Sequence, residues 1–241
     1  LVAELEPKMK TQPGFVKATR AVCKSEWAYE AALVFDRGRE SRLLVIPPLF
    51  DEANKLRHTL VEVLRRLDAS GIDGVLPDLP GCNESLAPLA EQTLENWRAA
   101  AAAASAHFRA TGVLTVRSGA LLRPPDVPGW DYAPQDGRKT LRSMIRARII
   151  ASREAGREEP RDAIEAKGRA EGITLAGWHI GPALFTALEA AELPTREDGV
   201  TIIEHETIGE RPAWLRAEPD FDAAQADALA AIIAVAMRQP E

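Results

Sequence analysis

The sequence predicts an α/β protein with a mostly parallel central sheet and helices on both of its faces. Segments typical of strands and helices alternate as β, α, β, α, β between residues 42 and 117. The strand segment 42–47 is a continuous apolar run, as expected for a strand buried on both faces of a parallel sheet. With 241 residues, 46% of them apolar, the chain is long enough to bury a sizeable core without a metal or a disulfide.

The first half of the chain contains most of the elements that define this pattern. In the helix expected at 53–69, leucines recur at helical spacing, and Gly71 is a natural stop. The strand expected at 112–117 enters a turn of small residues. The expected elements are, in order, strand 27–35, turn 36–39, strand 42–47, helix 53–69, strand 72–76, loop 77–85, helix 90–110, strand 112–117 and turn 118–120.

The second half is expected to be less regular. Residues 123–137 are rich in Pro, Asp and Gly and are expected to form a loop, and residues 153–171 hold many charges and Pro160, typical of an exposed connection. The sequence thus predicts a single domain, 1–241, with 123–171 as an inserted cap or arm. The other expected elements are helix 139–155, strand 173–179, helix 182–192, strand 199–205, a loop through Trp214, and helix 222–238 with Asp222 as its N-cap.

Composition excludes several classes of protein. The formal charge of −6 argues against a general nucleic-acid binder. Two cysteines, Cys23 and Cys82, make neither a disulfide framework nor a four-ligand zinc site, so we expect no metal and no cofactor. No apolar run approaches the ~20 residues of a membrane span, and the chain opens without a signal-peptide pattern. These observations predict a cytoplasmic protein, and the chain begins at Leu1, with Met9 as a candidate initiator.

Two motifs resemble those of a known family. The run Pro47 to Arg57 resembles "PPFxEExNKSR", and Pro77 to Ser85 resembles "PDLxGCGDS", both from exosortase A system-associated hydrolase 2 of the α/β-hydrolase superfamily. This resemblance implies an α/β-hydrolase-like three-layer sandwich and an ancestry in ester or thioester hydrolysis. It also implies a place in an exopolysaccharide or protein-sorting locus. Weaker matches lie at 130–148, 176–184 and 212–218.

The motif that should carry the nucleophile is altered. α/β-Hydrolases place a serine on a tight Gly-x-Ser-x-Gly turn after a strand. Here that turn falls on 115–119, and the nucleophile position is Arg117, which cannot attack a carbonyl because it stays protonated. Ser118, one position further, is a candidate nucleophile; the alternative is a serine at a helix start that caps or packs.

The candidate base is equally incomplete. The triad order is nucleophile, acid, histidine, and only His205 lies near the last strand in that order. Asp198 precedes it by a strand length of roughly 23 Å, too far for a hydrogen bond. We therefore do not expect an intact Ser–His–acid triad, and the alternative places His205 at a strand end. Whether the protein is an enzyme stays open at this point.

Other candidates lie at the expected carboxyl edge of the sheet, where α/β proteins bind ligands. Cys82 in the loop 77–85 is a nucleophile only if a base lowers its pKa; the alternative is a small buried thiol. Asp78 in the same loop is expected to order the turn.

A second hypothesis is a catalytically inactive binding protein. Asn54, Lys55 and Arg57 open the helix that follows the strand at 42–47, and a helix N-terminus with basic side chains suits an anion. Arg117 would add a cation, giving a pocket for a small anionic ligand or partner. The alternative is a solvated first turn, capped by Asp51 or Asn54.

One segment is basic in an otherwise acidic chain. The helix at 138–157 also has an apolar stripe, which permits contact with an anionic membrane or an acidic partner. The favoured interpretation is an ordinary cap helix that packs its stripe on the domain, and the oligomeric state is left open. Its basic residues are Arg138, Lys139, Arg142, Arg146, Arg148, Arg153 and Arg157.

The length of the second half carries a last expectation. Between the helix that ends near Leu193 and the strand at 199 there is almost no spacer. A strand and the loop that would bear the acid are expected to be missing there.

Overall fold

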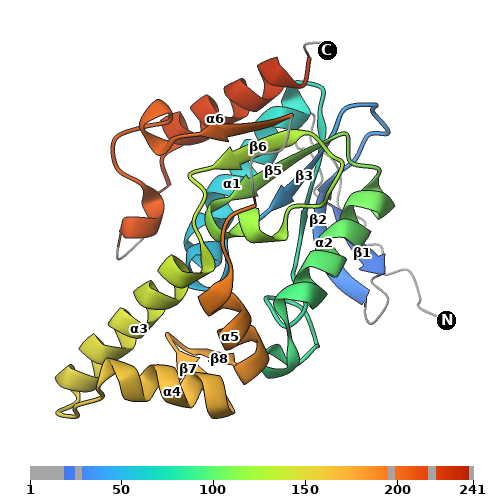
Figure 1. The fold of residues 1–241 in the computed structure, drawn as a ribbon. Coiled ribbons are helices and arrows are strands. Elements are labelled where there is room, and N and C mark those ends of the chain that lie inside the picture. The colour runs from blue at the N-terminus through green and yellow to red at the C-terminus, as the bar shows by residue number, and fades with distance from the viewer. Residues whose placement is uncertain (1–18, 25–28, 195–198, 217–220, 239–241) are drawn as a thin grey trace, which may run out of the picture.

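A seven-stranded sheet forms the centre of the molecule (Figure 1). The computed structural model describes residues 19–24, 29–194, 199–216 and 221–238. The strand order across the sheet is β1-β2-β4-β3-β5-β6-β9. The strands are β1 (Thr19–Lys24), β2 (Tyr29–Phe35), β3 (Arg42–Ile46), β4 (Asp73–Pro77), β5 (Gly112–Val116), β6 (Gly129–Tyr132) and β9 (Val200–Ile203).

Most of this sheet is parallel, as the sequence predicts. β3 pairs in parallel with β4 and β5, and β6 pairs in parallel with β5 and β9. Within this sheet, the antiparallel pairings of the described strands are β1 with β2 and β2 with β4. Every residue of β4 and β5 is buried, as expected for central strands of a parallel sheet, and neither sequence alternates between apolar and polar residues.

Helices cover both faces of the sheet. α1 and α6 pack together on one face, over a core that includes Leu64, Leu114 and Ile233. α2 covers the other face, over a core that includes Leu44, Trp97 and Val113. The helices are α1 (Asp51–Ala69), α2 (Leu94–Phe108), α3 (Gly137–Glu154), α4 (Arg161–Glu171), α5 (Pro182–Ala190) and α6 (Ala223–Ala236). Short 3₁₀ turns lie at Leu89–Glu91, Arg117–Leu122, His205–Thr207 and Ala213–Leu215.

The expectation of a loop over 123–137 is wrong, because it contains β6. Gly129 starts this strand, and its backbone approaches β5 so closely that a Cβ would lie 1.9 Å from the Val113 carbonyl oxygen. The Pro- and Gly-rich composition that suggested a loop therefore marks the entry to a strand that only a glycine can begin.

Two further expectations need correction. The segment 153–171 is not merely an exposed connection, since α4 begins directly after Pro160 and buries Ile164. The strand expected at 173–179 is instead a hairpin of β7 (Ile173–Leu175) and β8 (Trp178–Ile180), because Ala176 and Gly177 both take positive φ. By contrast, Asp222 caps α6 as predicted, accepting hydrogen bonds from the amides of Ala224 and Gln225.

The helices between β6 and β9 form a cap. α3, α4, α5 and the β7–β8 hairpin gather at one end of the molecule, at the bottom of Figure 1. Phe50, which follows β3, packs edge-on between Trp97 of α2 and Trp178 of the hairpin, with ring centroids 5.8 and 5.9 Å away. The cap thus shares one apolar core with the sheet. That residues 123–171 form a separate inserted unit stays a prediction.

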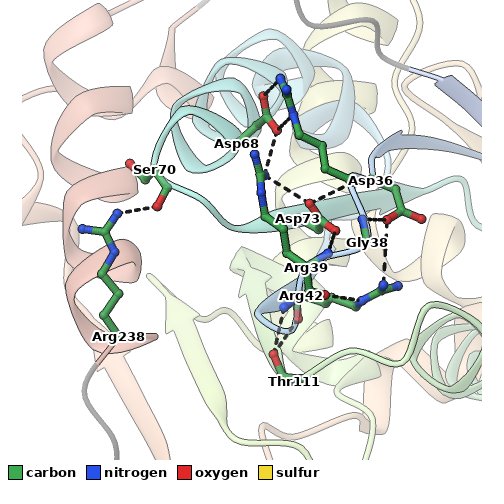
Figure 2. Close-up of polar contacts among 10 residues, drawn as sticks. Asp36, Gly38, Arg39, Arg42, Asp68, Ser70, Asp73, Thr111 and Arg238 are labelled. Carbon is green, nitrogen blue, oxygen red and sulfur yellow. Dashed lines mark hydrogen bonds and ion pairs between the residues drawn. The ribbon is translucent and has the colours of Figure 1, made fainter.

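A polar cluster closes the opposite end of the sheet, at the amino ends of the parallel strands (Figure 2). The buried carboxylate of Asp68 accepts hydrogen bonds from Arg37 (2.7 Å) and Arg39 (2.8 Å). Arg39 also reaches Asp73 at the start of β4. Burial would raise the pKa of Asp68, but the two guanidinium groups outweigh burial and hold this pKa below its ordinary value. The cluster fixes the β2–β3 turn against the end of α1.

None of the helices in the described ranges combines the length and the apolar character that crossing a membrane requires.

Candidate functional site

Arg117 stands where β5 ends and the next turn begins. Its φ is +54°, a conformation that is uncommon for residues other than glycine and that costs free energy. The 3₁₀ turn Arg117–Leu122 follows, so the chain reverses sharply at this residue. The strand-to-helix turn expected from the sequence is therefore present, and Arg117 is at its apex.

The guanidinium of Arg117 is fully engaged by its surroundings. Its Nε and Nη2 donate to the two carboxylate oxygens of Glu52, at 3.0 and 3.3 Å. Nη1 donates to the Ala133 carbonyl at 2.9 Å, and Nη2 also reaches the Gln135 side chain. The indole of Trp214 covers the cation, 4.4 Å from its ring centre. Arg117 thus joins α1, β5, the segment after β6 and the C-terminal segment.

Ser118 is wholly buried, with an exposed fraction of 0%. Its hydroxyl accepts a hydrogen bond from the backbone N–H of Leu49, in the loop between β3 and α1, at 3.0 Å. Ser118 therefore packs and ties two loops together, and it makes no capping hydrogen bond in its own turn.

His205 lies directly after β9, at the strand end. Its Nδ1 is 2.7 Å from the Tyr132 hydroxyl, and its ring packs against Trp214 at 4.9 Å. Its buried Nε2 has no hydrogen-bond partner among the described residues. Burial lowers the pKa of His205; Glu206 opposes this and Arg117 adds to it. Among the described residues no hydrogen bond joins His205 to Ser118, and Asp198 lies outside the described residues.

Tyr132 is the hydroxyl that does meet a histidine. Its side chain is buried at the end of β6, in the cluster with His205 and Trp214. Burial raises the pKa of Tyr132 above its ordinary value, with Arg117 opposing and Glu206 adding to this effect. A buried phenol with a raised pKa is a poor nucleophile, so this pair offers no substitute for a serine.

The three other basic or polar residues of the predicted anion pocket face different partners. Lys55 pairs with Asp51 at 2.9 Å and approaches the Trp214 carbonyl at 3.5 Å. Arg57 pairs with the buried Asp78 at 3.0 Å, and Asn54 is exposed. Neither of the two expected caps is used, because Phe50 is the N-cap of α1 and makes no side-chain capping bond.

The loop after β4 gathers acidic groups around the thiol. Asp78 accepts hydrogen bonds from Arg57 and from the Asn83 amide, and so orders this loop. Burial raises the pKa of Cys82 to about 12, with further contributions from Asp78 and Glu30. The base that would lower this pKa is not supplied by the neighbours, whose negative charges act in the opposite direction.

Three hollows among the described residues are not lined by Arg117. Two of them have volumes of about 10 Å³ each, enough for one water molecule. A larger groove of about 540 Å³ lies at the amino ends of the strands, beside Thr111, Trp130 and Met237. Among the residues that the structure describes, no cluster of three or more His, Cys, Asp or Glu side chains is placed to hold a metal ion.

Comparison with known proteins identifies the fold. The sequence matches no model of a known family and no curated protein. Among solved structures, mouse alpha/beta hydrolase domain-containing protein 10 is similar with a TM-score of 0.50 and 19% identity, over 71% of this chain and 70% of that one. The chain has the α/β-hydrolase fold.

Two other solved structures are similar at lower scores. The ferulic-acid complex of Est1E from Butyrivibrio proteoclasticus has a TM-score of 0.49 at 12% identity, over 72% of each chain. A putative hydrolase from Agrobacterium vitis S4 has a TM-score of 0.46 at 17% identity, over 90% of this chain and 98% of that one.

Several residues of the site are not identifiable from the sequence. Glu52, Tyr132 and Gln135 are contacts of Arg117 or His205 that lie 18 to 73 positions away from them along the chain. Of these three residues, only Glu52 could have been suspected from the sequence, because it is an acidic residue in the first turn of a helix beside the predicted basic cleft.

Proposed function

We propose that this protein is a non-catalytic member of the α/β-hydrolase fold, descended from an ester or thioester hydrolase and acting by binding. The observation that carries this proposal is the occupied elbow. Arg117 takes the position and the positive φ of the nucleophile, and its guanidinium is bonded to Glu52. A guanidinium cannot attack an acyl carbon, because it stays protonated. An anionic substrate could bind to it only by displacing the Glu52 carboxylate.

The environment of Ser118 supports the same proposal. In active α/β-hydrolases the oxyanion hole combines the N–H after the nucleophile with an N–H from the loop between β3 and the first helix. In this protein the Leu49 N–H comes from that loop, and it already donates to Ser118 Oγ. A donor that is occupied within the protein does not stabilise a developing oxyanion.

The histidine supports it as well. A base must reach the nucleophile, and the described contacts of His205 lead instead to Tyr132 and Trp214. On this proposal the Arg117 cluster is a structural clamp, and the elbow is not a pocket for a free anion.

The family and the cellular setting are part of the proposal. The motifs Pro47–Arg57 and Pro77–Ser85 support kinship with exosortase A system-associated hydrolase 2. That kinship favours a binding role in an exopolysaccharide or protein-sorting system, with the protein in the cytoplasm.

The proposal is tested by screening short acyl esters and acyl thioesters with the wild-type protein, Ser118→Ala and His205→Ala. We expect all three to give the same background rate. A wild-type rate at least tenfold above both variants would overturn the proposal.

The same screen includes a fourth protein, the variant Arg117→Ser. Arg117→Ser restores the nucleophile type at the elbow, but the Leu49 N–H stays bonded to Ser118 and the Nδ1 of His205 stays bonded to Tyr132. We therefore expect this variant to show no turnover either.

A further inference from the structure

The solvent side of the cap helix α3 bears a row of arginines. Arg142, Arg146 and Arg153 are exposed, and none of them has a hydrogen bond or an ion pair with another described residue. At 3.6 residues per turn these three and Arg138 fall within an arc of about 80° and extend over about 22 Å. We call these four residues the arginine stripe.

The apolar side of α3 points the other way and is already used. Leu141, Met144 and Ile145 are buried in the core that the cap shares with the sheet. Arg148, on that side, is paired with Glu159 at 3.0 Å. Packing of α3 therefore explains its apolar residues and Arg148. Within the arginine stripe, Arg138 donates one long hydrogen bond of 3.4 Å to the Glu189 carbonyl, and the other three arginines have no structural role among the described residues.

The stripe is also set apart by charge. Residues 138–157 contain seven basic side chains and a single acidic one, Glu154, a formal charge of +6. The whole chain carries −6, so the remainder carries −12. Uncompensated arginines in a row repel one another, and an acidic protein has carboxylates with which to neutralise them. Glu189 interacts with Arg138 at one end of the stripe, but no described carboxylate forms an ion pair with Arg142, Arg146 or Arg153.

We propose that the arginine stripe is a docking surface for an anionic lipid bilayer. Four arginines along one side of a helix can meet a planar layer of acidic headgroups at the same time. Ile150, 48% exposed, lies beside the row and can contact the headgroup boundary. Because the apolar side of α3 stays buried, the contact is electrostatic adsorption without insertion of the helix.

Other anionic partners fit the observations less well. A nucleic-acid surface favours a basic protein, and the rest of this chain would be repelled by a long polyanion. An acidic peptide is usually held in a groove, and none of the three hollows described above borders α3.

The test is sedimentation with vesicles of phosphatidylcholine, with and without phosphatidylserine. We expect the wild-type protein to bind only the vesicles that contain phosphatidylserine, and to be released at about 0.5 M salt because screening weakens surface charges. The triple variant Arg142→Gln, Arg146→Gln, Arg153→Gln should bind on the order of 100-fold more weakly. Gln has nearly the helix propensity of Arg, so α3 should persist, and thermal unfolding checks this.

A matched control removes three exposed arginines elsewhere: Arg65→Gln, Arg109→Gln and Arg211→Gln. The net charge changes equally, and binding should stay within about threefold of wild type. The proposal is overturned if the wild type ignores both kinds of vesicle, if the two triple variants weaken equally, or if the wild type binds polyglutamate or duplex DNA in preference to vesicles. Hydrolytic activity has no part in this measurement, so its outcome is independent of the proposal for the elbow.

Discussion

Arg117 and Glu52 form a partly buried ion pair at the centre of the site, with side-chain exposures of 13% and 19%. Removing one partner leaves the other charge poorly solvated, so Arg117→Ala and Glu52→Ala should each lower the free energy of unfolding by about 2 kcal/mol. The double variant should lose less than the sum of the two, with a coupling of about 1 kcal/mol in urea unfolding. The exposed pair Arg161–Glu165 provides the control, with a coupling below about 0.5 kcal/mol. Additive losses at Arg117 and Glu52 would contradict a clamp.

Glu30 predicts a pH dependence of stability. Both of its carboxylate oxygens are buried without a hydrogen-bond partner among the described residues. Burial raises the pKa of Glu30 above its ordinary value of 4.5, with Ser85 opposing and Asp78 adding to the effect. A raised folded-state pKa favours folding only while the group is protonated, and this contribution is lost as the pH rises through that pKa.

Glu30→Gln removes this titration while keeping the shape of the side chain. The variant should match the wild type near pH 4 and be more stable by about 1 kcal/mol at pH 8, because it no longer buries a charge. Urea unfolding at several pH values measures the difference. A difference that does not change with pH would be contrary to this account.

Single residues also show what the sequence reveals of the site. The sequence alone shows that Arg117 cannot act as a nucleophile, because this conclusion depends only on the chemistry of one side chain. The partners of Arg117 and His205 depend on folding, because Glu52 and Tyr132 reach them across the sheet edge. The sequence also suggests an anion site at Lys55 and Arg57, because both side chains are cationic. In the structure Asp51 neutralises Lys55 and Asp78 neutralises Arg57.

At the scale of elements, the elbow depends on close contact between β3 and the turn after β5. A Cβ on Gly119 would lie 2.6 Å from the Pro47 carbonyl oxygen and 2.7 Å from that of Ile46. Both are backbone atoms, so Gly119→Ala must push the two elements apart and should cost about 3 kcal/mol of unfolding free energy. Gly177→Ala at the hairpin turn meets no atom within 4 Å and should cost only about 1 kcal/mol, from its positive φ. Equal losses at the two sites would argue against a tight elbow.

Elements with strong local signals are predictable and the others are not. β3, β4, β5 and α1 were predicted because buried apolar runs and leucine spacing are local properties. β6 and α4 are not predicted because their stability comes from neighbours: β6 pairs with β5 and β9, and α4 packs on α3 and α5 and buries Ile164. In each case tertiary contacts outweighed a composition that favours loops.

For the whole molecule, the order of elements determines the fold, whereas the function depends on the site. In the sheet β9 pairs directly with β6, and the expected loss of a strand and an acid-bearing loop before β9 stays a prediction. The cap is joined to the sheet domain by an aromatic contact, in which Trp178 of the β7–β8 hairpin packs on Phe50 and Phe50 packs on Trp97 of α2. The fold is that of α/β-hydrolases, and on the function proposed above its reacting groups are replaced or occupied.

The central claim is that no serine of this protein acts as a nucleophile. Intact-mass analysis after incubation with a fluorophosphonate probe tests it most directly, because the probe adds a fixed mass to an activated serine. The account predicts an unmodified mass for the wild-type protein under conditions that fully label an active serine hydrolase. A stoichiometric adduct on the wild-type protein that disappears in Ser118→Ala would contradict it.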